Sequence, residues 1–211
     1  MAGGYAIELA VGRPLREHGD IDVLVLRRDH LAVQEALRGW EWWAADPPGV
    51  LRPWRPQEVL PAGVQDIWCR PAHDKPWQIQ VMLDESSGQE WVSRRNLRLR
   101  RPIAALGHTS ADGIPYLAPE IQLFYKAEDP RPKDEHDFTD ALTVLGSRQR
   151  DWLRVALADT YRNHPWQRAL GEFPDRRRAT KTPAGTPGLS EEDGTEHRPR
   201  RQSAAGSGGG G

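Results

Sequence analysis

Two aspartates separated by one residue stand at the start of a strongly apolar segment, and their chemistry indicates a metal site. Asp20 and Asp22 flank Ile21 at the head of the sequence IDVLVL. Side chains two apart on a β-strand point to the same face, so both carboxylates should project together. Carboxylates this close repel each other, and Mg²⁺ would relieve that repulsion because it prefers oxygen ligands and shares its coordination shell with substrate phosphates. We therefore expect Asp20 and Asp22 to be metal ligands and catalytic residues.

A pair of glycines precedes the aspartates and is suited to seating phosphates. Gly3 and Gly4 lack a Cβ, which lets the backbone approach a phosphate closely. Their amides lie at the start of an expected helix, whose dipole favours an anion there. Arg16 and His18, in the polar loop before the aspartates, would contact a triphosphate or brace the loop. Because phosphoryl-type transfer combines a divalent metal with a bound triphosphate, we expect ATP or another nucleoside triphosphate as substrate.

The segments that would position these residues combine helices and strands. Apolar residues spaced three or four apart predict a helix, and short apolar, β-branched runs predict a strand. The expected helices cover residues 1–12, 30–40, 119–129, 137–145 and 150–166. The expected strands cover residues 21–26, 64–71, 77–85 and 90–95. The first strand should be central and buried on both faces, the second and third should pair antiparallel, and residues 44–63 should form a long connection.

This order indicates an α+β fold in three parts. Residues 1–118 are expected to form the catalytic core, with a mixed sheet and flanking helices, and residues 119–173 a C-terminal helical region. Residues 174–211 are dominated by Arg, Thr, Pro, Gly and Ser. Such a segment buries too little apolar surface to offset the entropy of ordering, so we expect a disordered tail.

Composition excludes several classes of protein and partner. With 29 basic and 30 acidic residues the formal net charge is -1, so no global positive field holds long nucleic acid, and nucleic acid is not an expected partner. The single cysteine, Cys69, excludes an intrachain disulfide and is expected to be a buried thiol. No apolar run approaches the ~20 residues of a membrane helix, and the N-terminus lacks signal-peptide features. A cytoplasmic protein without a membrane partner is therefore expected.

The glycine pair and the aspartate pair together resemble a known family signature. Residues 3–9 read GGYAIEL and residues 16–22 read REHGDID. They are similar to the pattern Gly-Gly-Trp-Ala-(Ile/Val)-Asp, a short gap, then Arg-x-His-x-Asp-(Ile/Leu)-Asp of the aminoglycoside 2''-adenylyltransferase and lincosamide nucleotidyltransferase families. Residues 119–138 are similar to the helical "PE…L…K…KD…D" segment of those families. The resemblance spans roughly residues 2–145 and implies a nucleotidyltransferase core of the DNA-polymerase-β type.

The resemblance also implies roles for residues of the helical segment. Lys126 and Lys133 would contact nucleotide phosphates or structural carboxylates. Asp134 and Asp137 would anchor the helix or bond Arg16. These roles complete the expected nucleotide-binding set formed by the glycine pair, Arg16 and His18.

One feature of the family is missing from this sequence. The family supplies a third carboxylate from a later strand, as metal ligand or general base, and the expected position falls nearest Gln80, a neutral amide. Asp84, on the strand face of Gln80 by alternation, or Asp66, on the neighbouring strand, would substitute as catalytic residue, with Asp84 favoured. A surface or turn role for each is the alternative. Glu8 stands where the family often has Asp, and a loop-bracing role is expected for it.

The expected activity is therefore transfer of AMP from ATP to a hydroxyl of a small molecule, with an aminoglycoside-like antibiotic as one candidate. Two alternatives stay open. The basic cluster in residues 94–101 would serve a toxin-like nucleotidyltransferase that acts on RNA or protein, unless it is a strand edge balanced by nearby acids. Gln80 and the short segment ahead of the glycine pair are also compatible with a nucleotide-binding pseudoenzyme. Most tryptophans are expected to pack in the core, with one or two lining an acceptor pocket.

Overall fold

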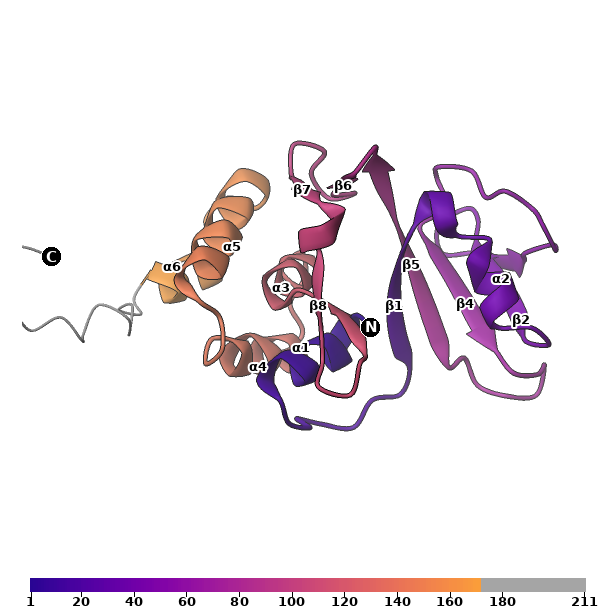
Figure 1. Cartoon of the computed structure of the whole chain (residues 1–211), viewed down its shortest axis with the longest axis horizontal. Helices are drawn as coiled ribbons and strands as arrows, with labels where there is room; N and C mark the ends of the chain where they lie inside the picture. The colour runs from indigo at the N-terminus through magenta and orange to yellow at the C-terminus, as the bar shows by residue number, and fades with distance from the viewer. Residues whose placement is uncertain (172–211) are drawn as a thin grey trace, which may run out of the picture. The chain divides into compact units, whose positions relative to one another are not determined.

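The computed structural model describes residues 1–171, which form an α+β fold of one mixed sheet and several helices (Figure 1). The α+β class expected from the sequence is confirmed. The expected disordered tail lies outside the described residues. None of the helices within residues 1–171 is both long enough and apolar enough to cross a membrane.

The main sheet has seven strands and is antiparallel except at one pair. Along the sheet the order is β3 (Leu51–Pro53), β2 (Glu41–Ala45), β4 (Asp66–Arg70), β5 (Ile79–Ser87), β6 (Glu90–Val92) and β7 (Arg100–Pro102), and β1 (Ile21–Leu26) pairs with β5. The β1 and β5 strands run parallel, and the predicted antiparallel pairing of β4 with β5 is confirmed. A separate hairpin joins β8 (Gly107–Thr109) to β9 (Pro115–Leu117).

The connection expected over residues 44–63 is partly wrong, because it contains a hairpin. Strands β2 and β3 pair antiparallel, with Trp43 opposite Pro53 and Ala45 opposite Leu51. The proline and glycine residues that indicated a loop occupy the turn of this hairpin, where the Val50 N–H donates to the carbonyl of Pro47. Strand β2, which contains Trp42 and Trp43, lies before this turn and extends the sheet beyond β4.

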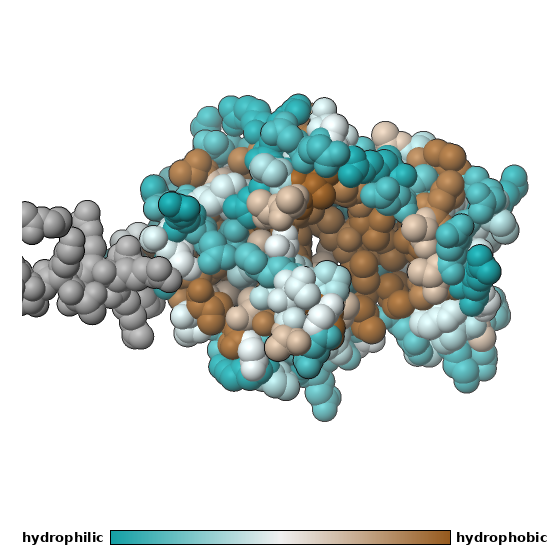
Figure 2. Space-filling model, viewed as in Figure 1, coloured by the Kyte–Doolittle hydropathy of each residue, from teal (hydrophilic) through white to brown (hydrophobic). Residues whose placement is uncertain are grey.

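Strand β1 is not the central, doubly buried strand expected from its composition. It pairs with β5 alone, only Leu26 of its six residues is buried, and Ile21 keeps 36% of its surface exposed. On the other side of β1 the N–H of Ala2 donates to the carbonyl of Asp22 at 2.7 Å. Apolar side chains gather over β1 and β5 in a hollow beside α2 (Ala32–Ala36) (Figure 2).

The two faces of the sheet are covered differently. One face carries a core around α2, and Cys69 lies in this core as expected, where burial raises the pKa of its thiol to about 12. On the opposite face α1 (Gly3–Val11) and α3 (Pro119–Lys126) cover the end of β1 near Leu26 through Ala6 and Ile121, and Trp91 of β6 joins the same core. The beginning of β1, with Asp22, is left outside this second core.

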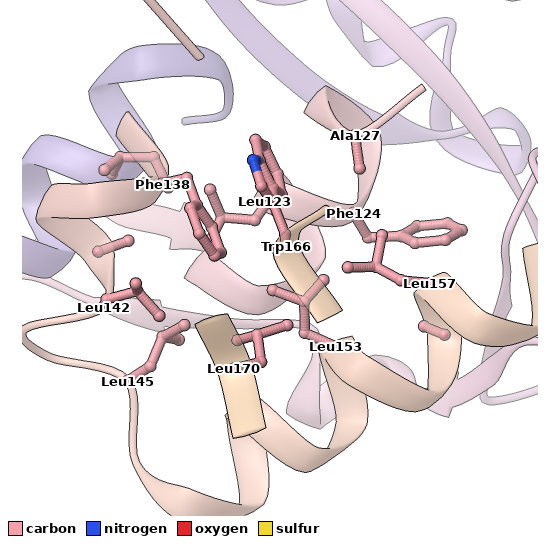
Figure 3. Close-up of a cluster of buried hydrophobic side chains, with 13 residues drawn as sticks. Leu123, Phe124, Ala127, Phe138, Leu142, Leu145, Leu153, Leu157, Trp166 and Leu170 are labelled. Carbon is pink, nitrogen blue, oxygen red and sulfur yellow. The ribbon is translucent and has the colours of Figure 1, made fainter. Parts of the chain in front are cut away.

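A third core joins the C-terminal helices to α1. Helices α3, α4 (Pro132–Ala141), α5 (Ser147–Thr160) and α6 (Trp166–Gly171) point apolar side chains at one another, and the Phe138 and Trp166 rings stack 4.2 Å apart (Figure 3). Ile7 of α1 belongs to the same core, so packing continues across the boundary expected at residue 118. The helix expected over residues 150–166 divides in two, because Asn163 adopts a left-handed φ of 58° and Pro165 precedes α6.

A buried ion cluster fixes the junction between α3 and α4. The Lys126 Nζ lies 2.6 Å from Asp134 Oδ1 and 2.9 Å from Asp137 Oδ2, and all three side chains are at least nine-tenths buried. Asp134 also accepts from the Arg131 N–H and from Arg131 Nε, at 3.1 and 2.7 Å. Burial would raise the pKa of Asp134, but the hydrogen bonds from Arg131 and Lys126 outweigh it and lower the pKa to about 2. These bonds start α4 at Pro132, five residues before the expected helix.

We predict that the Asp134→Asn variant is less stable by about 2 kcal/mol at neutral pH. A pKa lowered from 3.8 to about 2 in the folded state contributes roughly this free energy of unfolding. The contribution is fully present above the unfolded pKa and is lost as the pH falls through the folded pKa, so the difference from wild type should shrink between about pH 4 and pH 2. Urea unfolding at a series of pH values measures it.

Asp140→Asn is the matched control, because it removes an exposed salt bridge to Arg13 that should contribute less than about 1 kcal/mol. Equal stability of the Asp134→Asn variant and wild type at pH 7 would contradict the prediction, as would a loss that does not change with pH.

Candidate active site

Asp22 lies at the head of β1, in register with Gln80 of the neighbouring strand. Burial raises the pKa of the Asp22 carboxyl, and the charge of Asp20 raises it further. Strand β1 begins at Ile21, so Asp20 lies in the loop before it and not on the strand face expected for it. The positive charges of Lys126, Lys133 and Arg131 act on the pKa of Asp22 in the opposite direction. Asp22 is thus acted on by one neighbouring negative charge and by three positive charges from residues 126–133.

Gly3 makes room for the carboxylate of Asp22. It has a φ of +63°, and a Cβ on Gly3 would lie 1.8 Å from Asp22 Oδ2. The Gly3 N–H donates to Gln122 Oε1 of α3 at 2.8 Å, and this bond is buried. The glycine is needed here for a close approach, but the approaching group is a carboxylate of the protein itself.

Gly4 likewise makes room for two side chains of the polar loop that precedes β1. A Cβ on Gly4 would lie 2.2 Å from His18 Cε1 and 2.3 Å from Arg16 Nη2. The structure therefore brings together all four residues of the expected phosphate loop, with the two polar side chains lying over the glycine. Arg16 also points toward α4, with Nη2 3.5 Å from Asp137 Oδ2, one of the two roles expected for that aspartate.

Glu8 fastens the loop of residues 12–20 to α1. Its Oε1 accepts from the N–H groups of Leu15 and Arg16 at 2.9 and 3.1 Å and lies 2.8 Å from His18 Nε2. Burial would raise the pKa of Glu8, but the hydrogen bonds from Leu15 and His18 outweigh it and lower the pKa. The His18 ring also lies 4.0 Å from the ring of Tyr5. Glu8 thus braces the loop that delivers Asp20, as expected.

The two lysines expected at the nucleotide-binding site differ in how far other groups of the protein already bind them. Lys126 is held in the buried ion cluster with Asp134 and Asp137, so it acts on Asp22 from a fixed position. Lys133 is exposed on the first turn of α4, and no ion pair within residues 1–171 includes it. Arg131, which the sequence did not single out, keeps 61% of its side chain exposed while bonded to Asp134. The feature of the sequence that could have identified Arg131 as a site residue is its position two residues before Lys133.

The acidic pair fits a divalent cation in chemical type. Hard carboxylate oxygens that repel each other are the donors that Mg²⁺ takes when it also binds phosphates and water. Within residues 1–171 no group of three or more His, Cys, Asp or Glu side chains is arranged to hold a metal. Asp20 and Asp22 would therefore hold magnesium jointly with a substrate, and the protein does not enclose the ion in a complete cage.

The two candidates for the third carboxylate lie in very different surroundings. Asp84 is completely buried and accepts from Trp91 Nε1 at 2.5 Å and from the Tyr125 hydroxyl. Burial raises the pKa of Asp84 although both hydrogen bonds oppose the rise. Asp66 keeps 29% of its side chain exposed and accepts from Gln80 Nε2 at 3.1 Å. Of the two, only Asp66 borders open space, next to Gln80.

A pocket of about 440 Å³ opens on the sheet face that carries Asp22, Gln80 and Asp66. Trp68 and Trp77 line it together with Asp66 and Gln80. Gln80 is opposite Asp22 on one side and opposite Trp68 on the other, so its side chain separates the acidic pair from the pocket. Two tryptophans thus line a pocket, as the sequence suggested without identifying them.

The basic cluster is largely neutralised by the protein. Arg95 pairs with Glu128, Arg100 with Glu90 at 3.7 Å, and Arg101 with Glu120 at 2.7 Å. Arg94 lies 3.7 Å from both Asp66 and Asp84, and Arg98 donates to the carbonyl of Asp159 at 3.4 Å. These contacts agree with the interpretation of the basic cluster as a strand edge whose charges are balanced by nearby acids.

Comparison with known proteins gives the family of the chain. A family model described as aminoglycoside-2''-adenylyltransferase matches residues 1–141, which is most of the chain. Among solved structures, the solution structure of the antibiotic-resistance factor ANT(2'')-Ia matches with 18% sequence identity and a TM-score of 0.44, over 80% of this chain and 85% of that one. A search of curated proteins gives no match. Since the family model covers the glycine pair, both aspartates and the α3–α4 segment, the chain belongs to the aminoglycoside-2''-adenylyltransferase family.

Proposed function

We propose that this chain transfers AMP from ATP to a hydroxyl of a small-molecule acceptor in a magnesium-dependent reaction on a polymerase-β-like core. The observation that carries the proposal is the packing of the Asp22 carboxylate against Gly3, where the charge of Asp20 and the positive charges of Lys126, Lys133 and Arg131 all act on it. The acids are suited to a metal, and the cations are suited to the phosphates of a nucleotide. Membership of an adenylyltransferase family supports the same chemistry.

The reaction needs one bond to form and one to break. The acceptor hydroxyl oxygen bonds to the α-phosphorus of ATP, the bond from that phosphorus to the bridging oxygen breaks, and pyrophosphate leaves. A magnesium ion at the acidic pair would neutralise phosphate charge and orient the triphosphate. Lys133 and Arg131, the exposed cations of α4, would bind the phosphates, while Lys126 keeps α3 and α4 in place beneath them.

We propose Asp66 as the group that takes the proton from the acceptor hydroxyl. It borders the pocket and bonds Gln80, so a hydroxyl placed beside Gln80 lies within reach of its carboxylate. Asp84 is completely buried beneath Trp91 and Tyr125, which supports a structural role for it. Asp66 on β4 would thus take the role of the acid that the family resemblance implies near residue 80 on β5.

The basic cluster offers little support for a toxin-like enzyme that modifies RNA or protein, because its arginines are bonded to acids or to a backbone carbonyl. The pseudoenzyme alternative is favoured by the neutral amide of Gln80, which cannot take a proton. Incubation with labelled ATP, Mg²⁺ and a panel of aminoglycosides, lincosamides and bulk tRNA distinguishes the small-molecule transferase, the toxin-like enzyme and the pseudoenzyme. Label on a small molecule supports the proposal, label on RNA or protein supports the toxin, and nucleotide binding without product supports the pseudoenzyme.

We predict that Asp22→Asn and Asp20→Asn each lower AMP transfer about 10³-fold and weaken magnesium-dependent ATP binding, because either change removes a metal ligand. Transfer rates and ATP affinity with and without Mg²⁺ measure this. Asp74→Asn, at an exposed aspartate in the β4–β5 turn, is the control and should change neither quantity. Unchanged magnesium-dependent affinity in an Asp20→Asn/Asp22→Asn double variant would show that the acidic pair is not the metal site.

We predict that Gly3→Ala abolishes detectable transfer, whereas Gly12→Ala leaves it close to wild type. Both glycines have positive φ, so each change should cost about 1–2 kcal/mol of stability. A Cβ on Gly3 collides with Asp22, but a Cβ on Gly12 meets no atom within 4 Å. Equal activity losses, measured at a temperature where both variants are folded, would mean that the approach of Gly3 to Asp22 is irrelevant to catalysis.

We predict that Asp66→Asn lowers kcat by about 10²–10⁴, the usual contribution of a general base, with little change in ATP affinity. Adding Gln80→Asp to that variant should recover part of the rate, because an acid returns to the position that faces Asp22. Single-turnover kinetics measure both. A full rate in the Asp66→Asn variant would exclude the role proposed for Asp66.

A further inference from the structure

We propose that Gln122 of α3 is a phosphate-binding residue, and that its side-chain NH₂ group donates to the triphosphate of the nucleotide beside Asp22. The inference rests on the proposed transfer reaction and adds to it a donor outside the glycine pair. It is supported by the contacts of the Gln122 amide, by the N–H groups at the start of α1 and by the face of α3 that carries Gln122.

The first support is that the protein uses only one end of the Gln122 amide. Oε1 accepts from the Gly3 N–H at 2.8 Å, so the NH₂ group is the end that remains. Gln122 Nε2 makes no hydrogen bond within residues 1–171. The residue keeps only 3% of its surface exposed, yet Nε2 is not one of the fully buried atoms of the described chain that lack a partner, so it borders open space. Because the polar groups of buried side chains are normally paired, this NH₂ group is available to a ligand oxygen.

Gln34 shows how a purely structural glutamine is bonded in the same protein. It is buried to a similar degree, with 5% of its surface exposed. Its Oε1 accepts from the Gln57 N–H, and its Nε2 donates to the carbonyl of Arg55, both at 2.9 Å. Both ends of the Gln34 amide are therefore used within the fold, whereas Gln122 has a donor to spare.

The second support is the start of α1, which lies next to the Gln122 amide. The first N–H groups of an α-helix have no partner inside the helix, and together they favour an anion. In α1 the Gly3 N–H is taken by Gln122, whereas the N–H groups of Gly4 and Tyr5 make no hydrogen bond within residues 1–171. The NH₂ group of Gln122 thus returns to this helix end the donor that Gly3 no longer offers.

The third support is the place at which the amide is fixed. A Cβ on Gly3 would lie 1.8 Å from Asp22 Oδ2, so the group that binds the Gly3 N–H lies close to the acid expected to bind the metal. Lys126 is one helical turn after Gln122 on the same face of α3, and its charge also acts on Asp22. A phosphate that shares a metal ion with Asp22 would therefore lie within reach of the NH₂ group.

NMR of the side-chain amides in the isotope-labelled full-length protein tests the contact directly. The Gln122 NH₂ signals are identified by their absence from the Gln122→Met variant, or through the backbone assignment if that variant does not fold. We expect them to shift when inorganic tripolyphosphate is added with Mg²⁺, because a charged oxygen becomes their acceptor. The Gln34 signals are the control and should not move. Gln122 signals that stay fixed, or that move only with a non-hydrolysable ATP analogue, would overturn the assignment to phosphate.

Affinity for tripolyphosphate distinguishes a phosphate donor from an anchor of Gly3. Gln122→Met should weaken magnesium-dependent binding about 10- to 100-fold, the range for a hydrogen bond to a charged group. Gln34→Met removes a buried amide of the same size and should leave the affinity unchanged. Gln122→Glu keeps an acceptor for the Gly3 N–H but has no NH₂ group, so its binding should stay weak. Wild-type affinity in either folded Gln122 variant would show that the NH₂ group binds no phosphate.

Binding of the ATP analogue to the wild-type protein separates this inference from the transfer reaction. Magnesium-dependent binding of the analogue together with fixed Gln122 signals would refute the role of Gln122 and leave AMP transfer standing. Failure of the wild-type protein to bind both the analogue and tripolyphosphate would refute the transfer reaction, and the role of Gln122 with it.

Discussion

The repulsion between Asp20 and Asp22 is the constraint to which the rest of the site responds. Burial and the neighbouring negative charge both raise the pKa of Asp22, so the folded chain keeps a carboxylate where it is electrostatically unfavourable. The opposing cations come from α3 and α4, far away in the sequence. Their arrangement depends in turn on the buried contacts of Lys126 with Asp134 and Asp137. The ion cluster thus holds the Lys126 ammonium in a fixed position from which its charge acts on Asp22.

The same constraint explains the irregular backbone ahead of the sheet. Asp22 can occupy its position because Gly3 has no Cβ, and Gln122 fixes Gly3 by accepting its N–H. Asp20 lies just before the start of β1, in a loop that Glu8 holds by accepting two backbone N–H groups. The Gly3–Gln122 bond joins α1 to α3, and the two bonds accepted by Glu8 join α1 to the loop. The residues of the acidic pair are therefore held by contacts from α1, from the loop of residues 12–20 and from α3.

The parts of this arrangement that depend on local pattern could be predicted from the sequence. Alternation over β4 and β5 predicted their antiparallel pairing, which is confirmed. The role of Asp20 and Asp22 as metal ligands stays a prediction, although the charge of Asp20 acts on Asp22. The rest depended on contacts between distant segments. Apolar composition could not show that β1 lacks a second partner strand, because the N-terminal backbone and two cores supply its burial. The choice between Asp84 and Asp66 likewise depends on α3, whose Tyr125 covers one and leaves the other exposed.

Arg94 connects the buried acid to the exposed one, and this connection gives the replacement at Gln80 a physical rationale. Its guanidinium lies 3.7 Å from Asp84 in the core and 3.7 Å from Asp66 at the pocket. Both Asp84 Oδ1 and Arg94 Nε are buried without a hydrogen-bond partner, so their attraction is electrostatic and they hold each other in place. An acid at residue 80 would add a third negative charge beside Asp22. With an amide at residue 80, the negative charge stands instead on Asp66 of the neighbouring strand, which accepts a hydrogen bond from Gln80, lies 3.7 Å from Arg94 and lines the pocket.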